Sequence, residues 1–361
     1  MKIAQVAPLV ESVPPRLYGG TERLVAYLTE ELVRQGHDVT LFASGDSITS
    51  ADLVPCTPQA LRLDPSVRDP IPYYMLMLDR VRQRAGEFDI IHFHIDQFHF
   101  PLFRDLADRV LTTLHGRQDL PDLLPLYAGF PDLKLVSISD NQRRAIHNSN
   151  FLGTVHHGLP EELLTPTLNP KGGYLAFLGR ISPEKGPDRA IRIARAVGIP
   201  LKIAAKIDRA DREYFKSQIE PLLEGDGVEF IGEIDERRKT SFLGEARALL
   251  FPIDWPEPFG LVMIEAMACA TPVLAFGCGS VFEVVDNGVT GYIVDCEEAA
   301  IRRVGAVLAL DRARVRRRFE ERFSASRMAF DYVKLYEKLL TNPRRRELPT
   351  VLTQPHRAVV L

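Results

Sequence analysis

Two glutamates separated by seven residues form the strongest chemical pattern in the chain. Glu257 lies between two prolines, which keep it in a loop. Glu265 follows in a stretch, residues 259–269, that is apolar on nearly every face and predicts a buried helix. A buried carboxylate needs a partner, and we expect Glu265 to find one in a ligand hydroxyl. Taken singly, Glu265 is also compatible with a glutamate satisfied by an arginine or a backbone donor, and Glu257 with an exposed loop carboxylate.

The start of that helix is a second candidate for ligand binding. Backbone N–H groups in the first turn of a helix have no partner within the helix, and they favour an anion or sugar oxygens. The residues that would supply them are Phe259, Gly260 and Leu261.

A further pattern places two cations in one loop. Residues 178–188 predict a strand end, a turn opened by Gly179, and a helix that begins at Pro187. Arg180 and Lys185 would then leave the carboxyl end of a parallel strand, which is where doubly wound sheets bind ligands. A guanidinium fork and a mobile ammonium together can stabilise a departing diphosphate. A solvated basic loop is the alternative for this segment taken alone.

Length and composition indicate which elements position these residues. A chain of 361 residues favours two domains, and 45% apolar with 26% charged residues is typical of a globular protein. The formal net charge of -3 gives no field for nucleic acid, and the four cysteines form no Cys-x-x-Cys pair. Without a leader-like segment or an apolar run of membrane-spanning length, we expect a cytoplasmic protein with reduced thiols. Peripheral membrane contact stays open.

Short β-branched runs alternate with helical patterns through both halves, which predicts two parallel, doubly wound sheets. In the first half, Leu24, Leu28 and Leu32 lie on one helix face that ends at Gly36. The strands predicted there are residues 3–7, 39–43, 90–95, 110–114 and 135–138. The strands predicted in the second half are residues 174–178, 201–205, 228–232, 248–251, 272–275 and 292–294.

A Pro- and Gly-rich stretch at residues 163–173 suggests the domain boundary. We therefore expect an N-terminal domain at residues 1–168, a C-terminal domain at 169–322 and a loose tail at 341–361. Between them, residues 323–340 have the spacing of one long amphipathic helix. The arginines of residues 312–322 are interrupted by two glutamates, and we interpret them as a solvated helix face.

These segments together resemble the retaining glycosyltransferases of family 4 (glycosyl transferases group 1), and the resemblance covers nearly the whole chain. It implies the GT-B fold, two Rossmann-like domains facing across a cleft, with the acceptor on the N-terminal domain and the nucleotide sugar on the C-terminal one. The final helix would pack back on the first domain. Arg180 and Lys185 would hold the donor diphosphate, Glu257 the donor sugar and Glu265 the ribose.

The resemblance also implies candidate site residues whose side-chain chemistry alone would not indicate a role in the site. Residues 18–23 resemble the family's N-terminal glycine loop, in which Gly19 and Gly20 approach the donor phosphate. Residues 112–116 resemble the strand end whose histidine, His115, faces the transferred sugar, and packing is the alternative role. Residues 228–234 resemble the segment that lines the base, with Ile234 at its end. Ala270 departs from the family's usual glycine, and we expect packing to absorb the extra methyl.

The resemblance also implies the reaction. A hexose would move with retention from a nucleotide diphosphate sugar, UDP-glucose first and GDP-mannose second, to a hydroxyl acceptor that the sequence does not identify. We expect no cofactor and no metal, because the chain has no Asp-x-Asp pair. His92 and His94 share a strand face, but without a third ligand we favour a cleft-lining or packed pair over a metal site. The rival functions are a sugar-nucleotide 2-epimerase on the same fold and a catalytically silent nucleotide-sugar binding protein.

Overall fold

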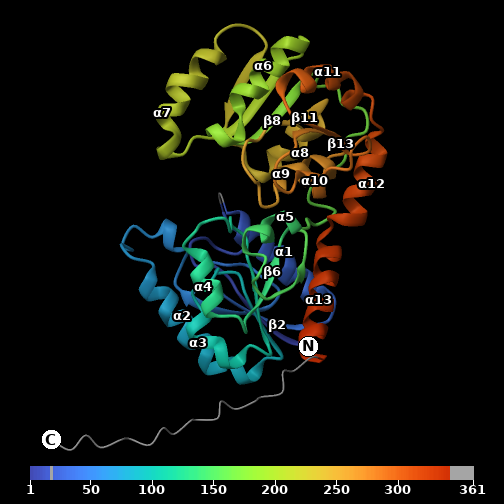
Figure 1. Ribbon diagram of the computed structural model, residues 1–361. Coiled ribbons are helices and arrows are strands. Elements are labelled where there is room, and N and C mark those ends of the chain that lie inside the picture. Colours follow the sequence, from blue (N-terminus) through green and yellow to red (C-terminus); the bar gives the residue numbers. More distant parts are fainter. Residues whose placement is uncertain (17–18, 342–361) are drawn as a thin grey trace, which may run out of the picture.

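The computed structural model describes residues 1–16 and 19–341, which form two parallel sheets flanked by helices (Figure 1). The first sheet has the order β3-β2-β1-β4-β5-β6-β7 and the second the order β10-β9-β8-β11-β12-β13. The strands of the first are β1 (Lys2–Val6), β2 (Asp38–Ser44), β3 (Asp52–Thr57), β4 (Ile90–Phe93), β5 (Val110–Thr113), β6 (Lys134–Ser137) and β7 (Phe151–Thr154). Those of the second are β8 (Leu175–Arg180), β9 (Leu201–Lys206), β10 (Val228–Gly232), β11 (Ala248–Phe251), β12 (Val273–Phe276) and β13 (Gly291–Val294).

Helices cover both faces of each sheet, as in doubly wound folds. With the first sheet are α1 (Gly20–Arg34), α2 (Ile71–Arg84), α3 (Phe100–Phe103), α4 (Leu123–Gly129) and α5 (Asp140–Arg143). With the second are α6 (Pro187–Val197), α7 (Arg212–Tyr214), α8 (Glu236–Gly244), α9 (Leu261–Ala268), α10 (Val281–Val284) and α11 (Glu297–Leu308). The chain ends in α12 (Arg312–Arg322) and α13 (Ala325–Thr341). The predicted α/β class with two parallel, doubly wound sheets is confirmed.

Every predicted strand is present, and two strands were missed, β3 and β7. Both lie at the edges of the first sheet. All four residues of β7 are only half-buried, and β3 carries Pro55 and exposed positions. An edge strand buries less apolar surface than a central one, so it has no continuous apolar run to reveal it.

The amphipathic helices form as their spacing predicts. Leu24, Leu28 and Leu32 of α1 are buried against β1 and β2, and Gly36 follows in the left-handed region with φ 84°. In Figure 1, α13 runs back along the first domain, where Tyr332 packs in the same cluster as these leucines. The final helix therefore packs against α1 of the first domain. Residues 342–361, most of the predicted tail, and Tyr18 lie outside the described residues.

The prediction of a solvated arginine face on α12 is wrong at its first turn. Arg312 is 9% exposed and donates to the carbonyls of Thr167 and Ala246 and to the hydroxyl of Thr271. Burial lowers the pKa of Arg312 to about 10. Arg316 likewise donates to the backbone carbonyls of Leu164 and Ala268. The face of α12 toward α9 therefore supplies hydrogen-bond donors to backbone carbonyls of neighbouring segments. Charge spacing alone cannot distinguish this from a solvated face.

The segment that joins the domains packs with the second one. Leu159 and Leu164 belong to the core around α9, and the proposed boundary after residue 168 lies within the segment between β7 and β8. Leu159 also exchanges backbone hydrogen bonds of 2.9 and 2.8 Å with Phe323 and Ala325, where α12 gives way to α13. The two segments by which the chain passes between the domains are therefore hydrogen-bonded to each other.

Candidate functional site

The cation loop leaves the carboxyl end of β8, as predicted. Gly179 and Arg180 are the last residues of β8, and a Cβ at Gly179 would meet nothing within 4 Å, so this strand end borders open space. Lys185 ends a short 3-10 turn, Pro183–Lys185, and Gly186 follows with φ 68°. A Cβ at Gly186 would lie 2.4 Å from the carbonyl oxygen of Pro252, so only glycine fits. The loop is thereby fixed against the segment that leads to Glu257.

Arg180 lies among three carboxylates. Its guanidinium contacts Glu184, and it lies 3.6 Å from Asp208 and 3.8 Å from Asp211. Burial would lower the pKa of Arg180, but these carboxylates outweigh it and raise the pKa. The alternative of a simple solvated basic loop does not describe this residue, which stays charged and is oriented by its neighbours.

Lys185 and Glu257 meet although they are 72 positions apart in the sequence. The Lys185 ammonium donates to Glu257 Oε2, which also accepts from the Trp255 indole N–H at 2.9 Å. The same ammonium lies 5.0 Å from the centroid of the Trp255 ring. Glu257 is 8% exposed, so it is not an exposed loop carboxylate. The two motifs that the sequence separates therefore form one charged group.

Glu265 has a protein partner that the sequence did not indicate. Its Oε1 accepts from the Lys239 ammonium of α8 at 2.6 Å, and Lys239 lies 3.3 Å from Glu236. Glu236 in turn pairs with Arg23 of α1, across the two domains. Burial would lower the pKa of Lys239, but both carboxylates outweigh it and raise the pKa. No spacing rule singles out Lys239, because its role depends on the approach of α8 to α9.

The start of α9 faces the first domain. Gly260 has φ 76°, and a Cβ there would lie 2.7 Å from Met263 Cε. Across the domains, a Cβ at Gly20 would lie 3.8 Å from Leu261 Cδ1. Among the described residues, the N–H groups of three residues at this helix start donate to no protein acceptor, whereas the Met263 N–H donates to Gly260 O at 3.0 Å. The predicted anion-binding helix start and the predicted glycine loop are therefore opposite each other. The N–H groups in question are those of Phe259, Gly260 and Leu261.

Gly19 precedes α1 and is tightly enclosed. A Cβ at Gly19 would lie 2.9 Å from Pro15 Cβ and 3.1 Å from Glu22 Oε2. Ile234 lines a pocket together with Ile231 and with Arg238 of α8. Ile234 is half-buried and packs partly against the core around α9.

His115 follows β5 at the face toward the second domain. Its ring stacks on His157 with 5.4 Å between centroids, and His157 contacts Phe259 edge-on at 4.9 Å. Burial lowers the pKa of His115 to about 3, so its ring is neutral. His94 Nδ1 lies 2.9 Å from His115 Nε2, and both His92 and His94 are buried, so this pair is packed. Within the described residues, no group of three His, Cys, Asp or Glu has metal-binding geometry.

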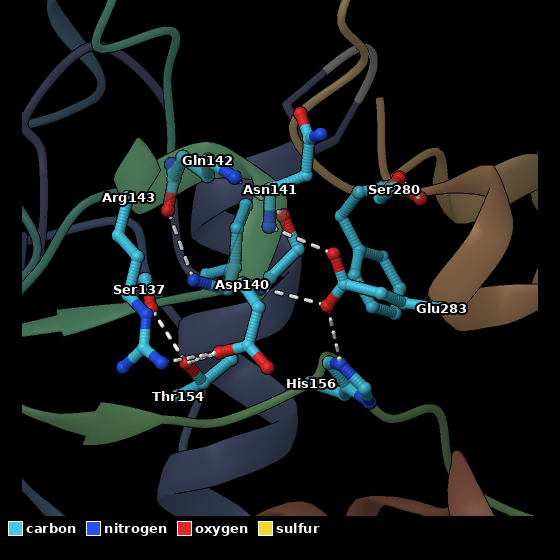
Figure 2. A network of polar contacts seen from close by, with 12 residues as sticks. Ser137, Asp140, Asn141, Gln142, Arg143, Thr154, His156, Ser280 and Glu283 are labelled. Carbon is cyan, nitrogen blue, oxygen red and sulfur yellow. Dashed lines mark hydrogen bonds and ion pairs between the residues drawn. The ribbon is translucent and has the colours of Figure 1, made fainter. Parts of the chain in front are cut away.

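A polar bridge that the sequence did not reveal joins the domains beside this site (Figure 2). Glu283 of α10 accepts from the backbone N–H groups of Asp140 and Asn141 at 2.7 and 2.8 Å. His156 Nε2 lies 3.3 Å from Glu283 Oε2. Burial would raise the pKa of Glu283, but these hydrogen bonds outweigh it and lower the pKa. His156 and His157 follow β7, so the rule that ligand groups follow strand ends could have found them had β7 been predicted.

Comparison with known proteins gives matches over most of the chain. The family described as "Glycosyl transferases group 1" matches residues 162–323, and "Glycosyltransferase Family 4" matches residues 18–182. A phosphatidyl-myo-inositol mannosyltransferase of Mycobacterium leprae is 24% identical over 95% of this chain and 98% of its own. A D-inositol 3-phosphate glycosyltransferase of Mycolicibacterium smegmatis is 24% identical over 77% of this chain and 75% of its own.

Solved structures share the whole fold. A sucrose-phosphate synthase from Thermosynechococcus elongatus superposes with a TM-score of 0.74 at 20% identity, covering 94% of this chain and 99% of that one. Anabaena HepE in complex with UDP and glucose superposes with a TM-score of 0.68 at 18% identity, covering 94% and 100%. None of the described helices is long and apolar enough to cross a membrane. With both halves matched in order and both sheets in place, the chain belongs to the family 4 glycosyltransferases with the GT-B fold.

Proposed function

We propose that this glycosyltransferase moves a hexose, with retention of configuration and without a metal, from a nucleotide diphosphate sugar to a hydroxyl acceptor. The observation that carries the proposal is the contact of Lys185 with Glu257, two residues from separate motifs, beside a helix start with unpaired N–H groups. A cation, a carboxylate and free N–H donors are what a diphosphate and the sugar attached to it need.

Each group takes a role that its chemistry suits. Arg180, Lys185 and the N–H groups of α9 offer positive potential to the diphosphate, which carries more charge as it leaves. Glu257 accepts from sugar hydroxyls and Glu265 from the ribose. Lys185 and Glu257 neutralise one another in the structure, and we expect a bound donor to engage Lys185 with its diphosphate and Glu257 with its sugar. The leaving phosphate takes the acceptor proton, so no protein nucleophile is required.

UDP-glucose is the donor we favour, and GDP-mannose is second. The fold neighbour from Anabaena was solved with UDP and glucose, which supports the first, and the full-length mycobacterial relative is named a mannosyltransferase, which supports the second. Turnover measured with each donor decides between them. The acceptor stays open, and peripheral membrane contact and a cytoplasmic location remain proposals.

The experiment is donor turnover with matched variants of one segment. Lys185→Ala and Arg180→Ala should each lower kcat by about 100-fold, because each removes charge stabilisation from the leaving diphosphate. Arg192→Ala is the control, since this arginine pairs with Asp188 and Glu297 and lies on α6 just after the loop. UDP and GDP release from the two donors is measured with an acceptor library, and NMR assigns the product anomer. Full turnover in both loop variants, or an inverted product, would overturn the proposal.

A further inference from the structure

A chain of buried hydrogen bonds connects His115 to the C-terminal helix. His115 Nε2 and His94 Nδ1 are 2.9 Å apart, and His94 Nε2 lies 2.7 Å from Gln5 Oε1. The amide nitrogen of Gln5 then donates to the Tyr336 hydroxyl of α13 at 3.2 Å. Strand β1, the segments that follow β4 and β5, and the final helix thus contribute to one polar path through the first domain. The sequence predicted the elements that contain Gln5 and Tyr336 but gave neither side chain a role.

From Tyr336 the path continues through two further residues and returns to α13 at Tyr332. His92 Nδ1 lies 2.8 Å from the Tyr336 hydroxyl, and His92 Nε2 lies 2.7 Å from Thr113 Oγ1. Thr113 Oγ1 lies 2.9 Å from the Tyr332 hydroxyl. Each contact has the length of a hydrogen bond. A group that donates its one hydrogen at one contact must accept at the next, so the donor at one contact determines the donor at its neighbour.

Every histidine of this path is neutral. Burial lowers the pKa of His92 and His94 well below the ordinary value, and that of His115 to about 3. A neutral imidazole carries one N–H and one acceptor nitrogen, so each ring has two tautomers and no third choice. The hydrogen bond at one nitrogen therefore fixes the state of the other.

The amide of Gln5 sets the direction of the path. Its oxygen faces His94 Nε2 and can only accept, so His94 carries its proton on Nε2. His94 Nδ1 is then an acceptor, and His115 must donate to it from Nε2. His115 Nδ1 is left as a bare acceptor. It is buried and has no hydrogen-bond partner among the described residues.

We propose that Gln5 and His94 are positioning residues that hold His115 in its Nε2–H tautomer, so that Nδ1 accepts a hydrogen bond from a sugar hydroxyl of the donor. The buried, unpaired Nδ1 is the second observation, because a buried acceptor without a partner costs free energy unless a ligand satisfies it. The ligand part rests on the proposed function, whereas the tautomer is a property of the free protein. Specificity then follows, since a group that cannot donate leaves Nδ1 unpaired.

The test is two-bond ¹H–¹⁵N correlation NMR of the full chain labelled with ¹⁵N-histidine, which separates protonated from bare ring nitrogens. The chain has nine histidines, and His115→Asn identifies the signals of His115. We expect a protonated Nε2 and a bare Nδ1 in wild type. A protonated Nδ1, the result of a reversed Gln5 amide, would overturn the proposal even if no variant folds.

Two variants separate positioning from packing. Gln5→Met keeps the volume of the side chain but removes the acceptor for His94, so His115 should become a mixture of tautomers. Tyr332→Phe removes a hydroxyl at the far end of the same path, and there His115 should keep its wild-type pattern. An unchanged His115 pattern in folded Gln5→Met would show that Gln5 only packs, and would refute its positioning role.

Ligand titration of the wild type completes the test. UDP-glucose should shift the His115 Nδ1 resonance in the direction of an accepted hydrogen bond, and UDP alone should leave it in place. A bound UDP-glucose that leaves Nδ1 unchanged would refute the hydroxyl contact. If neither nucleotide binds, the proposed function fails while the tautomer result still stands, so the two failures are distinguishable.

Discussion

Ala270 is the residue at which we expect the fold to respond most informatively to a single substitution. It lies directly after α9 with φ 64°, in the left-handed region. The N–H of Ala270 donates to Met267 O at 2.9 Å and the N–H of Thr271 to Ala266 O at 2.8 Å. These two bonds form a Schellman motif, in which glycine is the usual residue. The expectation about Ala270 concerned the packing of its methyl, and the structure adds a second consideration, because the backbone conformation at this position favours glycine.

The change is Ala270→Gly, and Ala266→Gly in the interior of α9 is its matched control. Both alanines are fully buried, so each substitution lowers the stability by two terms. The loss of one buried methyl costs about 0.8 kcal/mol, and the greater freedom of glycine in the unfolded chain costs about 0.5–1 kcal/mol. At Ala270 the relief of left-handed strain, about 1–2 kcal/mol, offsets both losses. We expect Ala270→Gly to be near neutral and Ala266→Gly to destabilise by about 1.5 kcal/mol.

The assay is urea unfolding followed by tryptophan fluorescence. The chain has one tryptophan, Trp255, which lies in the second domain beside Glu257, so the signal reports the domain that contains α9. The two variants should differ in unfolding free energy by about 1–2 kcal/mol, the strain term alone. Equal losses in both would refute the reasoning, because they would show that φ at Ala270 carries no cost.

Three further predictions concern the site and its charges. By calorimetry, Glu265→Ala should weaken binding of UDP alone, while Glu257→Ala should bind UDP normally and lose turnover; equal UDP binding by wild type and Glu265→Ala would exclude the ribose contact. Burial lowers the pKa of His115 to about 3 and those of His94 and His157 well below 6.5, so the unfolded chain binds more protons below pH 6.5. Stability should therefore fall as the pH drops from 7.5 to 5.5, by up to about 1.4 kcal/mol per pH unit for each histidine, and an unchanged urea midpoint would contradict this. Exhaustive chelation should leave the transfer rate intact, whereas loss with recovery on adding Mg²⁺ or Mn²⁺ would show that protein cations do not replace a metal.

Much of the architecture could be predicted because it depends on local patterns. Central parallel strands are buried on both faces, so their apolar runs are visible in the sequence, and α1 and α13 carry their spacing along the chain. The edge strands β3 and β7 escaped notice because they bury less surface. Because β7 was not predicted, His156 and His157 were missed as well, since only their position after a strand end makes them candidates.

The sequence by itself determined the two sheets, the loop that holds Arg180 and Lys185, and the carboxylates of Glu257 and Glu265, since glycine, proline and apolar periodicity act over a few residues. Only the tertiary structure decided their partners. Lys185 meets Glu257 across 72 residues, and Glu265 is paired by a lysine that no spacing rule identifies. The tautomer we propose for His115 likewise depends on contacts with two other strands and, through Gln5, with the final helix. Hydrogen bonds and ion pairs act over a few ångströms, and the fold alone brings distant residues to that range.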